Sequence, residues 1–380
     1  MTLYSTPEPD ATDRRVLGEI EQLRSELRHR LAEPRRWQGQ FRRTLTARAI
    51  QGSNSIEGYQ VSLDDAEDTV EHAPPLEGSS VPPEIVSYRD ALTFVQQLAG
   101  APHFRYERML LSALHFLMLD HRLDVSPGRY RTGTIFVRNN QTREVVYEGP
   151  EPERVPGLVD ELVDWLQHGD NDSPVYVRAA MAHLNLVNIH PWRDGNGRMS
   201  RCLHTLVLAR DGVLAPEFSS IEEWLGSGRN TYDYYDVLRE VGGLRWSPGT
   251  PGRDTHPWVR FCLRAHHMQA QLVRRRFDEY ARLWIELEEL ARTRGLPERA
   301  VHALFTSARG QRVRRATYQH DAGLSDGQAV RDLRTLTQAG LLNPTGETRA
   351  RSYTAAALLH DLGRRIEHDF PPITDPYEPE

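Results

Sequence analysis

The sequence predicts a mainly α-helical protein with one small surface β-hairpin and a C-terminal winged helix-turn-helix module. Apolar residues recur at steps of three and four along most of the chain, which is typical of amphipathic helices. Residues 133–146 differ, because they are rich in β-branched residues. At 380 residues the chain exceeds a usual domain of roughly 100–200 residues, so we expect a main domain with an appended module.

The first two thirds of the chain contain seven helical patterns. The first covers residues 13–31 and the second residues 37–57, which Gly58 is expected to end. The others cover residues 83–98, 106–119, 155–166, 175–187 and 198–210. Between the fourth and fifth lies the hairpin pattern of residues 133–146, with Asn139-Asn140 near its middle as a turn signal.

The last third begins with residues 242–255, a loop rich in Gly and Pro, followed by one long helix or two over residues 258–294. Residues 296–362 then show a helix, a basic helix over 314–321, a turn at 323–325, a helix over 326–339 and a hairpin that ends near Tyr353. This is the order of a winged helix. The proline-rich end predicts a flexible tail.

The composition limits the classes of function. A net charge of -6 argues against a protein that coats nucleic acid along its whole length, although a locally basic module could still bind it. Cys202 and Cys262 have neither a disulfide framework nor the spacing of zinc ligands. No apolar run approaches the roughly 20 residues that span a bilayer, so we expect a cytoplasmic protein that is not exported.

The segment His190-Pro-Trp-Arg-Asp-Gly-Asn-Gly-Arg-Met-Ser-Arg201 joins two helical patterns and is suited to nucleotide chemistry. Gly195, Asn196 and Gly197 can turn the backbone so that successive N–H groups converge just before a helix, which makes an anion site. Arg198 and Arg201 lie three residues apart, on one helix face, where they can clamp phosphate oxygens.

Two further residues of this segment could complete a catalytic site. Asp194 offers a hard oxygen ligand for Mg²⁺, which commonly uses one or two carboxylates together with substrate phosphates. His190 is the candidate general base for an attacking hydroxyl, an effect of roughly 10²–10⁴ in rate. Each residue alone is more often structural or solvated, but twelve contiguous residues of these types favour a functional site.

This segment resembles the signature of the Fic family, His-x-Phe-x-Asp/Glu-Gly-Asn-Gly-Arg-x-x-Arg, and departs from it only at Trp192. The resemblance extends upstream to Pro127-Gly-Arg-Tyr-Arg131 and downstream through Tyr234-Tyr235. It implies a helical Fic fold that transfers AMP from ATP, with Mg²⁺, to a Ser, Thr or Tyr hydroxyl of a protein. Trp192 would be the aromatic anchor of the loop.

The resemblance assigns a role to each residue of the loop. It implies that His190 is the base, Asp194 the magnesium ligand, and Asn196 with the flanking glycine amides the α-phosphate site. Arg198 and Arg201 would hold the β- and γ-phosphates. Kinases of the superfamily that resemble Doc carry Lys where this chain has Gly197, so Gly197 favours AMP transfer. Transfer of another nucleotide or of phosphocholine stays open.

The resemblance also implies two accessory features. The hairpin resembles the Fic flap, whose edge pairs with an extended stretch of the target, and Ile135, Phe136 and Val137 would contact it; the alternative is a hairpin that covers the core. Ser53-Asn-Ser-Ile-Glu57-Gly58 resembles the inhibitory motif of the family, in which the glutamate pairs with the second arginine, here Arg201. The alternative is an ordinary helix end.

The resemblance leads to a division of the chain into five parts. Residues 1–105 would form an N-terminal helical region with the inhibitory helix, 106–245 the Fic catalytic core, and 246–294 a loop and helical linker. Residues 295–365 would form the winged-helix module and 366–380 the flexible tail. Relatives with such a brake also remove AMP in some cases, and a homodimer and a protein substrate are the expected partners.

A different function would follow if the winged helix binds DNA and the protein is a transcription regulator with a sensory or vestigial Fic core. The arginines that could contact DNA are Arg312, Arg314, Arg315, Arg331, Arg334, Arg349 and Arg351. Winged helices also dimerise or dock targets, so both alternatives stay open.

Overall fold

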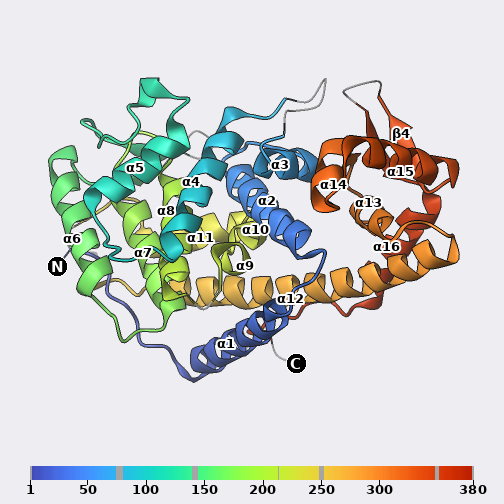
Figure 1. Ribbon diagram of the computed structural model, residues 1–380. Helices are drawn as coiled ribbons and strands as arrows, with labels where there is room; N and C mark the ends of the chain where they lie inside the picture. Colours follow the sequence, from blue (N-terminus) through green and yellow to red (C-terminus); the bar gives the residue numbers. More distant parts are fainter. Residues whose placement is uncertain are drawn as a thin grey trace.

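The computed structural model describes residues 2–73, 80–138, 144–212, 214–247, 252–346 and 351–378. Most of these residues are helical, and a β-hairpin and a three-stranded sheet complete the fold (Figure 1). The mainly helical class and the small hairpin that the sequence predicts are thereby confirmed. Within the described residues, no helix has both the length and the apolar character needed to cross a membrane.

The helices fall into three groups along the chain. The first is α1 Ala11–Ala32, α2 Gln38–Ile56, α3 Leu63–Val70, α4 Pro83–Ala99, α5 Arg108–Leu119 and α6 Val155–His168. The second is α7 Val175–Ile189, α8 Asn196–Asp211, α9 Pro216–Ser219, α10 Glu222–Leu225 and α11 Asn230–Gly242. The third is α12 His256–Thr293, α13 Val301–Ala308, α14 Arg315–Asp321, α15 Asp326–Gln338 and α16 Ala357–Asp369. Short 3₁₀ turns cover Leu123–Val125, Pro152–Arg154 and Glu298–Ala300.

The five strands found among the described residues belong to two separate sheets. Strands β1 Phe136–Arg138 and β2 Val145–Glu148 form the antiparallel hairpin, in which Val137 lies opposite Tyr147. The Asn139-Asn140 turn signal lies outside the described residues. The second sheet has the order β3-β5-β4 and consists of β3 Val313–Arg314, β4 Leu342–Thr345 and β5 Ser352–Ala355.

Helices α7 and α8 lie at the centre of the larger hydrophobic core. Nearly all residues of both helices are buried, because their apolar residues face α4, α5, α6 and α12 around them. The largest buried side chains include Trp192, Trp258 and Tyr88. The segment between α7 and α8 is therefore held at both ends by fully packed helices.

A second hydrophobic core joins the C-terminal module to the rest of the protein. The long helix α12 runs from the first core to this module as one element, so the segment predicted as one helix or two is the single helix His256–Thr293 (Figure 1). Helix α2 also takes part in both cores: Phe41 and Leu45 pack in the second core and Ile50 and Ile56 in the first. Helix α2 thus connects the two halves of the molecule.

The C-terminal module has the element order that the sequence predicts. Helix α13, strand β3, helices α14 and α15 and the β4–β5 pair follow one another, and α16 closes the module against α12 and α13. Ser325 caps α15 together with Gln328 in a reciprocal capping box. Its assignment as a winged helix, like the five-part division of the chain, stays a prediction.

The end of the chain differs from the flexible tail that we predict from its prolines. Tyr377 donates a hydrogen bond to Asp13 over 2.9 Å, Thr374 donates to Gln271, and Asp375 forms an ion pair with Arg264. These contacts fix residues 371–378 along α1 and α12. The proline content removes backbone donors, but long-range side-chain contacts hold the segment in place.

Candidate functional site

The segment between α7 and α8 has an unusual backbone that turns the chain sharply. His190 caps α7 in the left-handed region, with φ 51°, and Gly195 precedes α8 with φ 75°. A Cβ atom on residue 195 would also approach Leu119 Cδ1 to 2.8 Å, so glycine suits this position in conformation and in space. The two turns bring His190 and the N-terminus of α8 to the same side of the loop.

Trp192 anchors the loop in the core. Its side chain is fully buried and stacks on His115, with the ring centroids 4.4 Å apart. His115 accepts a hydrogen bond from the Gly128 amide at Nδ1 and donates from Nε2 to the carbonyl of Asp194. Burial lowers the pKa of His115 to about 4, so the ring is neutral and can make both bonds.

Asn196 closes the loop on itself. Its amide nitrogen donates to the Trp192 carbonyl over 2.8 Å, and its amide oxygen accepts from the Trp192 N–H over 3.0 Å. The side chain is therefore used within the loop, whereas the resemblance implies that Asn196 also binds phosphate. The first N–H groups of α8 have no partner within the helix and are the donors left for an anion.

The ring of His190 is held in one tautomer. Nδ1 lies 2.9 Å from the Val187 carbonyl, which can only accept, so Nδ1 carries the proton and Nε2 is the basic nitrogen. Burial lowers the pKa of His190 to about 4, and the positive charge of Arg131 acts in the same direction. A neutral imidazole at neutral pH is the form that a general base requires.

Arg198 and Arg201 are the two most enclosed cations of the site, each about 1% exposed. Nε and Nη1 of Arg198 and Nη1 of Arg201 have no hydrogen-bond partner among the described residues. Arg198 Nη2 lies 4.0 Å from Asp194 Oδ1. A buried guanidinium without a full set of acceptors is costly, which favours an anionic ligand at this place.

The predicted inhibitory residues Ser53 and Glu57 contact Arg201, which lies 144 residues after Glu57 in the sequence. Glu57 Oε1 lies 2.7 Å from Arg201 Nη2, and Arg201 also donates to the hydroxyl and the carbonyl oxygen of Ser53. A Cβ atom on residue 197 would lie 2.5 Å from Glu57 Oε1. The carboxylate therefore rests directly on Gly197, where the helix begins.

Three residues of the site were missed by sequence reasoning. Tyr59 lies with its ring 5.4 Å from the Arg198 guanidinium carbon, so it covers the arginine that Glu57 leaves open. Arg131 donates to the carbonyl oxygens of His190, Gly133 and Pro150, which ties the histidine to the base of the hairpin. The third is His115. Only the Pro127–Arg131 resemblance pointed to any of them.

Asp194 could hold a divalent cation. Its carboxylate is about 39% exposed and accepts a hydrogen bond from the Gly195 amide at Oδ1. Oδ2 lies 3.9 Å from Arg122, too far for a hydrogen bond, and so keeps free lone pairs. A partly exposed hard oxygen beside two buried arginines fits Mg²⁺ bound together with phosphates.

Among the described residues, the hairpin has one open edge, which no neighbouring backbone covers. On the outer side of β2, the Glu148 amide donates to Leu244 and the Trp246 amide donates to the Glu148 carbonyl, so this edge is covered. The edge left is β1, where Phe136 is exposed and Ile135 and Val137 are half-buried. Its residues therefore cover little of the core, which favours the flap interpretation.

Three of the seven module arginines proposed for DNA have carboxylate partners in the structure. Arg312 pairs with Asp64 and Asp65 of α3, Arg314 with Asp68, and Arg315 with Asp326. Arg331 and Arg334 are exposed on α15, and Arg351 precedes β5. Arg349 lies outside the described residues.

Comparison with known proteins shows what this part of the chain is similar to. Residues 106–208 match the model of the Fic/DOC family. The chain is 29% identical over 279 residues to protein adenylyltransferase fic-1 of Caenorhabditis elegans. The matched region covers 71% of this chain and 48% of that protein. The chain is 27% identical over 219 residues to protein adenylyltransferase Fic of Nematostella vectensis, covering 57% and 45%. The chain spans about half the length of these curated relatives.

Solved structures agree in fold. A Fic family protein from Desulfovibrio desulfuricans superposes with a TM-score of 0.57 at 21% identity, over 93% of this chain and 98% of that one. Fic-1 of Caenorhabditis elegans superposes with a TM-score of 0.53 at 24% identity, over 69% and 72%. At these identities the likeness shows the fold alone.

Proposed function

We propose that the protein, whose residues 106–208 match the model of the Fic/DOC family, is an adenylyltransferase that is held inactive by its own Glu57. It transfers AMP from ATP to a Ser, Thr or Tyr hydroxyl of a target protein, and of itself. The names of the matched relatives support this activity. The observation that carries it is the pair of buried arginines beside the N-terminus of α8, because Nε and Nη1 of Arg198 and Nη1 of Arg201 have no partner among the described residues.

The chain supplies each function that AMP transfer needs. Arg198, Arg201 and the first N–H groups of α8 would bind the triphosphate, and Asp194 would hold magnesium, which neutralises phosphate charge when bound. Nε2 of His190 accepts the proton of the target hydroxyl as its oxygen forms a bond to the α-phosphorus. The bond from that phosphorus to the bridging β-oxygen breaks, and pyrophosphate leaves.

The inhibition follows from the contact of Glu57 with Arg201. The carboxylate occupies Arg201 Nη2 and rests on Gly197, so it takes both the cation and the space that a terminal phosphate would use. The Glu57 carboxylate and a terminal phosphate are both negative, so it is unfavourable for both to lie beside Arg201 at the same time. ATP then binds unproductively or weakly until Glu57 moves. Removal of AMP by the same site belongs to this proposal as a secondary activity.

The group that is transferred can be read from the position of an isotope label. With the Glu57→Gly variant, we expect label from the α-phosphate of ATP to be retained on protein and label from the γ-phosphate to be released. The absence of a lysine at Gly197 is the reason for expecting AMP transfer. Retained γ-label would mean phosphorylation and would overturn the adenylylation proposal.

The open edge of β1 can be tested through its backbone. Gly149 donates to Ile135 within the hairpin, and strand alternation then turns the peptide groups of Phe136 outward. On the Glu57→Gly background, Phe136→Pro should lower labelling of lysate proteins roughly tenfold, because proline removes the outward donor. Phe136→Ala keeps that donor and serves as the control; equal losses in both would argue against pairing through the backbone.

The pH dependence of the transfer rate should follow the protonation state of the proposed base, His190. A base must be neutral, so activity should hold a plateau at neutral pH and fall as the pH approaches about 4, the pKa of His190. Arg131→Gln removes a positive charge that lowers this pKa, so the acid limb should move to higher pH by less than about one unit. The profile of the rate at saturating ATP measures both, and an unmoved limb would exclude the effect of Arg131.

The partners of the protein follow less directly. A protein with an accessible hydroxyl side chain is the proposed substrate, and a homodimer and a cytoplasmic location stay part of the proposal. We expect no DNA contact through Arg312 and Arg314 while α3 occupies them, so regulation of transcription is the less supported function. Duplex binding by a full-length Arg331→Ala/Arg334→Ala variant, compared with wild type, would measure what α15 contributes.

A further inference from the structure

The short connector between α2 and α3 covers both phosphate-site arginines. Glu57 contacts Arg201 and Tyr59 lies over Arg198, and only residues 57–62 separate the end of α2 from the start of α3. Because α3 also packs directly against α2, a displacement of α3 would be passed to the end of α2 and to the connector. The position of α3 therefore bears on both inhibitory contacts.

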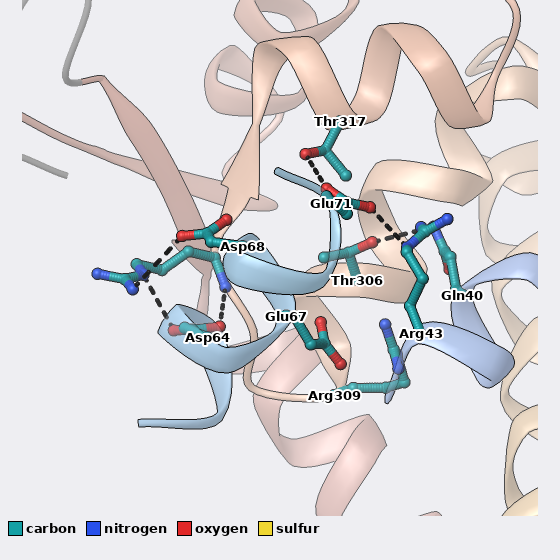
Figure 2. A pocket seen from close by; sticks show the side chains of 10 residues that line it. Gln40, Arg43, Asp64, Glu67, Asp68, Glu71, Thr306, Arg309 and Thr317 are labelled. Carbon is teal, nitrogen blue, oxygen red and sulfur yellow. Dashed lines mark hydrogen bonds and ion pairs between the residues drawn. The ribbon is translucent and has the colours of Figure 1, made fainter. Parts of the chain in front are cut away.

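Helix α3 is anchored by the C-terminal module. Arg312, just before β3, pairs with Asp64 over 3.0 Å and with Asp65 over 2.7 Å, and its backbone N–H donates to Asp64 as well. Arg314 pairs with Asp68 over 2.6 Å. Figure 2 shows Asp64 and Asp68 on the side of α3 that faces the module. We name these contacts between β3 and α3 the clamp.

Besides these ion pairs, helix α3 packs against α2 and α4, and it accepts hydrogen bonds from Thr44 at Glu67 and from Arg89 at the Thr69 carbonyl. Its eight residues bury only Ala66 and Thr69, and a helix of this length is marginal without tertiary contacts. Burial raises the pKa of Asp68 to about 6, although the positive charges of Arg314 and Arg312 act to lower this pKa. Without these arginines a half-buried carboxylate would lose its compensation, and α3 would be released more easily.

A second set of contacts joins the same helices to the module. Glu71, just after α3, pairs with Arg43 of α2 over 2.5 Å and accepts from Thr317 of α14 over 2.8 Å (Figure 2). Arg43 also pairs with Asp321 at the end of α14 over 2.6 Å. The polar cavity between the two parts is thus lined by charges that connect α2, α3 and α14.

We propose that the C-terminal module keeps the brake closed: the clamp of Arg312 and Arg314 on α3 holds Glu57 and Tyr59 over the phosphate site, and loosening the clamp activates the enzyme. This inference rests on the proposed adenylyltransferase function. It gives the module a role in regulation that requires no DNA. A ligand of the module that competes for these arginines would act as an activator.

The test uses the full chain with Arg312→Gln and Arg314→Gln together. Self-labelling from α-labelled ATP should rise roughly three- to tenfold over wild type, less than in Glu57→Gly, because the clamp shifts the population of the closed state while Glu57 remains. Backbone amides of residues 57–70 should exchange hydrogen faster. The matched control is Arg331→Gln/Arg334→Gln, which removes two arginines of the same module that lie on α15, away from α3, and should change neither quantity.

Additional variants distinguish a failure of the clamp proposal from a failure of the adenylyltransferase function on which it rests. Asp64→Asn/Asp68→Asn loosens the clamp from the α3 side and should give the same rise, which covers the case in which the arginine variant does not fold. Added to Glu57→Gly, either pair should have almost no further effect. If Glu57→Gly labels strongly and both clamp variants stay at the wild-type level, the clamp is wrong; if Glu57→Gly does not label, the proposed function fails instead.

Discussion

Replacing Glu57 with glycine should raise self-adenylylation roughly 10- to 100-fold. Glu57 Oε1 lies 2.7 Å from Arg201 Nη2, and Arg201 is almost fully buried, so the carboxylate is the main anion that this cation contacts. Its removal frees Arg201 for a terminal phosphate and opens the space above Gly197. Incorporation of label from α-labelled ATP, with time and per mole of protein, measures the change.

Glu57→Gln is the matched control, because it keeps the shape of the side chain and removes its charge. We expect an intermediate rise, since an amide can still accept from Arg201 but competes less well with phosphate. A Glu57→Gly variant that binds ATP and labels no faster than wild type would contradict the inhibitory role. Equal activity of the two variants would mean that charge alone maintains the inhibition.

Removing the imidazole of His190 on the Glu57→Gly background should lower labelling by about 10²–10⁴, the range of general base catalysis. The reason is geometric: Nδ1 is committed to the Val187 carbonyl, so Nε2 is the nitrogen that can accept a proton. Binding of ATP should change little, because the predicted phosphate contacts come from α8. Initial rates at saturating ATP, together with the affinity for ATP, measure the two effects separately.

The control for this variant is His168→Ala, which removes an exposed histidine of α6 and should leave labelling unchanged. Labelling that persists at the Glu57→Gly level in the double variant would refute the assignment of His190 as the base. A loss of ATP binding in that variant would instead point to a role in holding the loop.

Much of the fold could be predicted because its signals are local. The helices α1, α2 and α4 to α8 have apolar residues at helical spacing, and the loop from His190 to Arg201 carries its chemistry in twelve contiguous residues. The structure brings Ser53 and Glu57 to Arg201, a contact that resemblance implies and that spacing alone could not reveal. The roles of these residues stay predictions.

What could not be predicted depends on contacts between distant segments. Helix α3 is short and acidic, with only a narrow apolar face, and its position depends on packing against α2 and α4 and on arginines about 250 residues away. Tyr59, His115 and Arg131 acquire their places through burial and through backbone carbonyls that tertiary packing supplies. The end of the chain follows the same rule, because distant side chains order it.

A crystal structure of the Glu57→Gly variant with Mg²⁺ and a non-hydrolysable ATP analogue tests the central claim most directly. We expect the terminal phosphates on Arg198 and Arg201, the metal ion on Asp194, and the α-phosphorus on the side of the loop that Nε2 of His190 faces. A loop without the triphosphate, or an imidazole turned away from the α-phosphorus, would contradict the account.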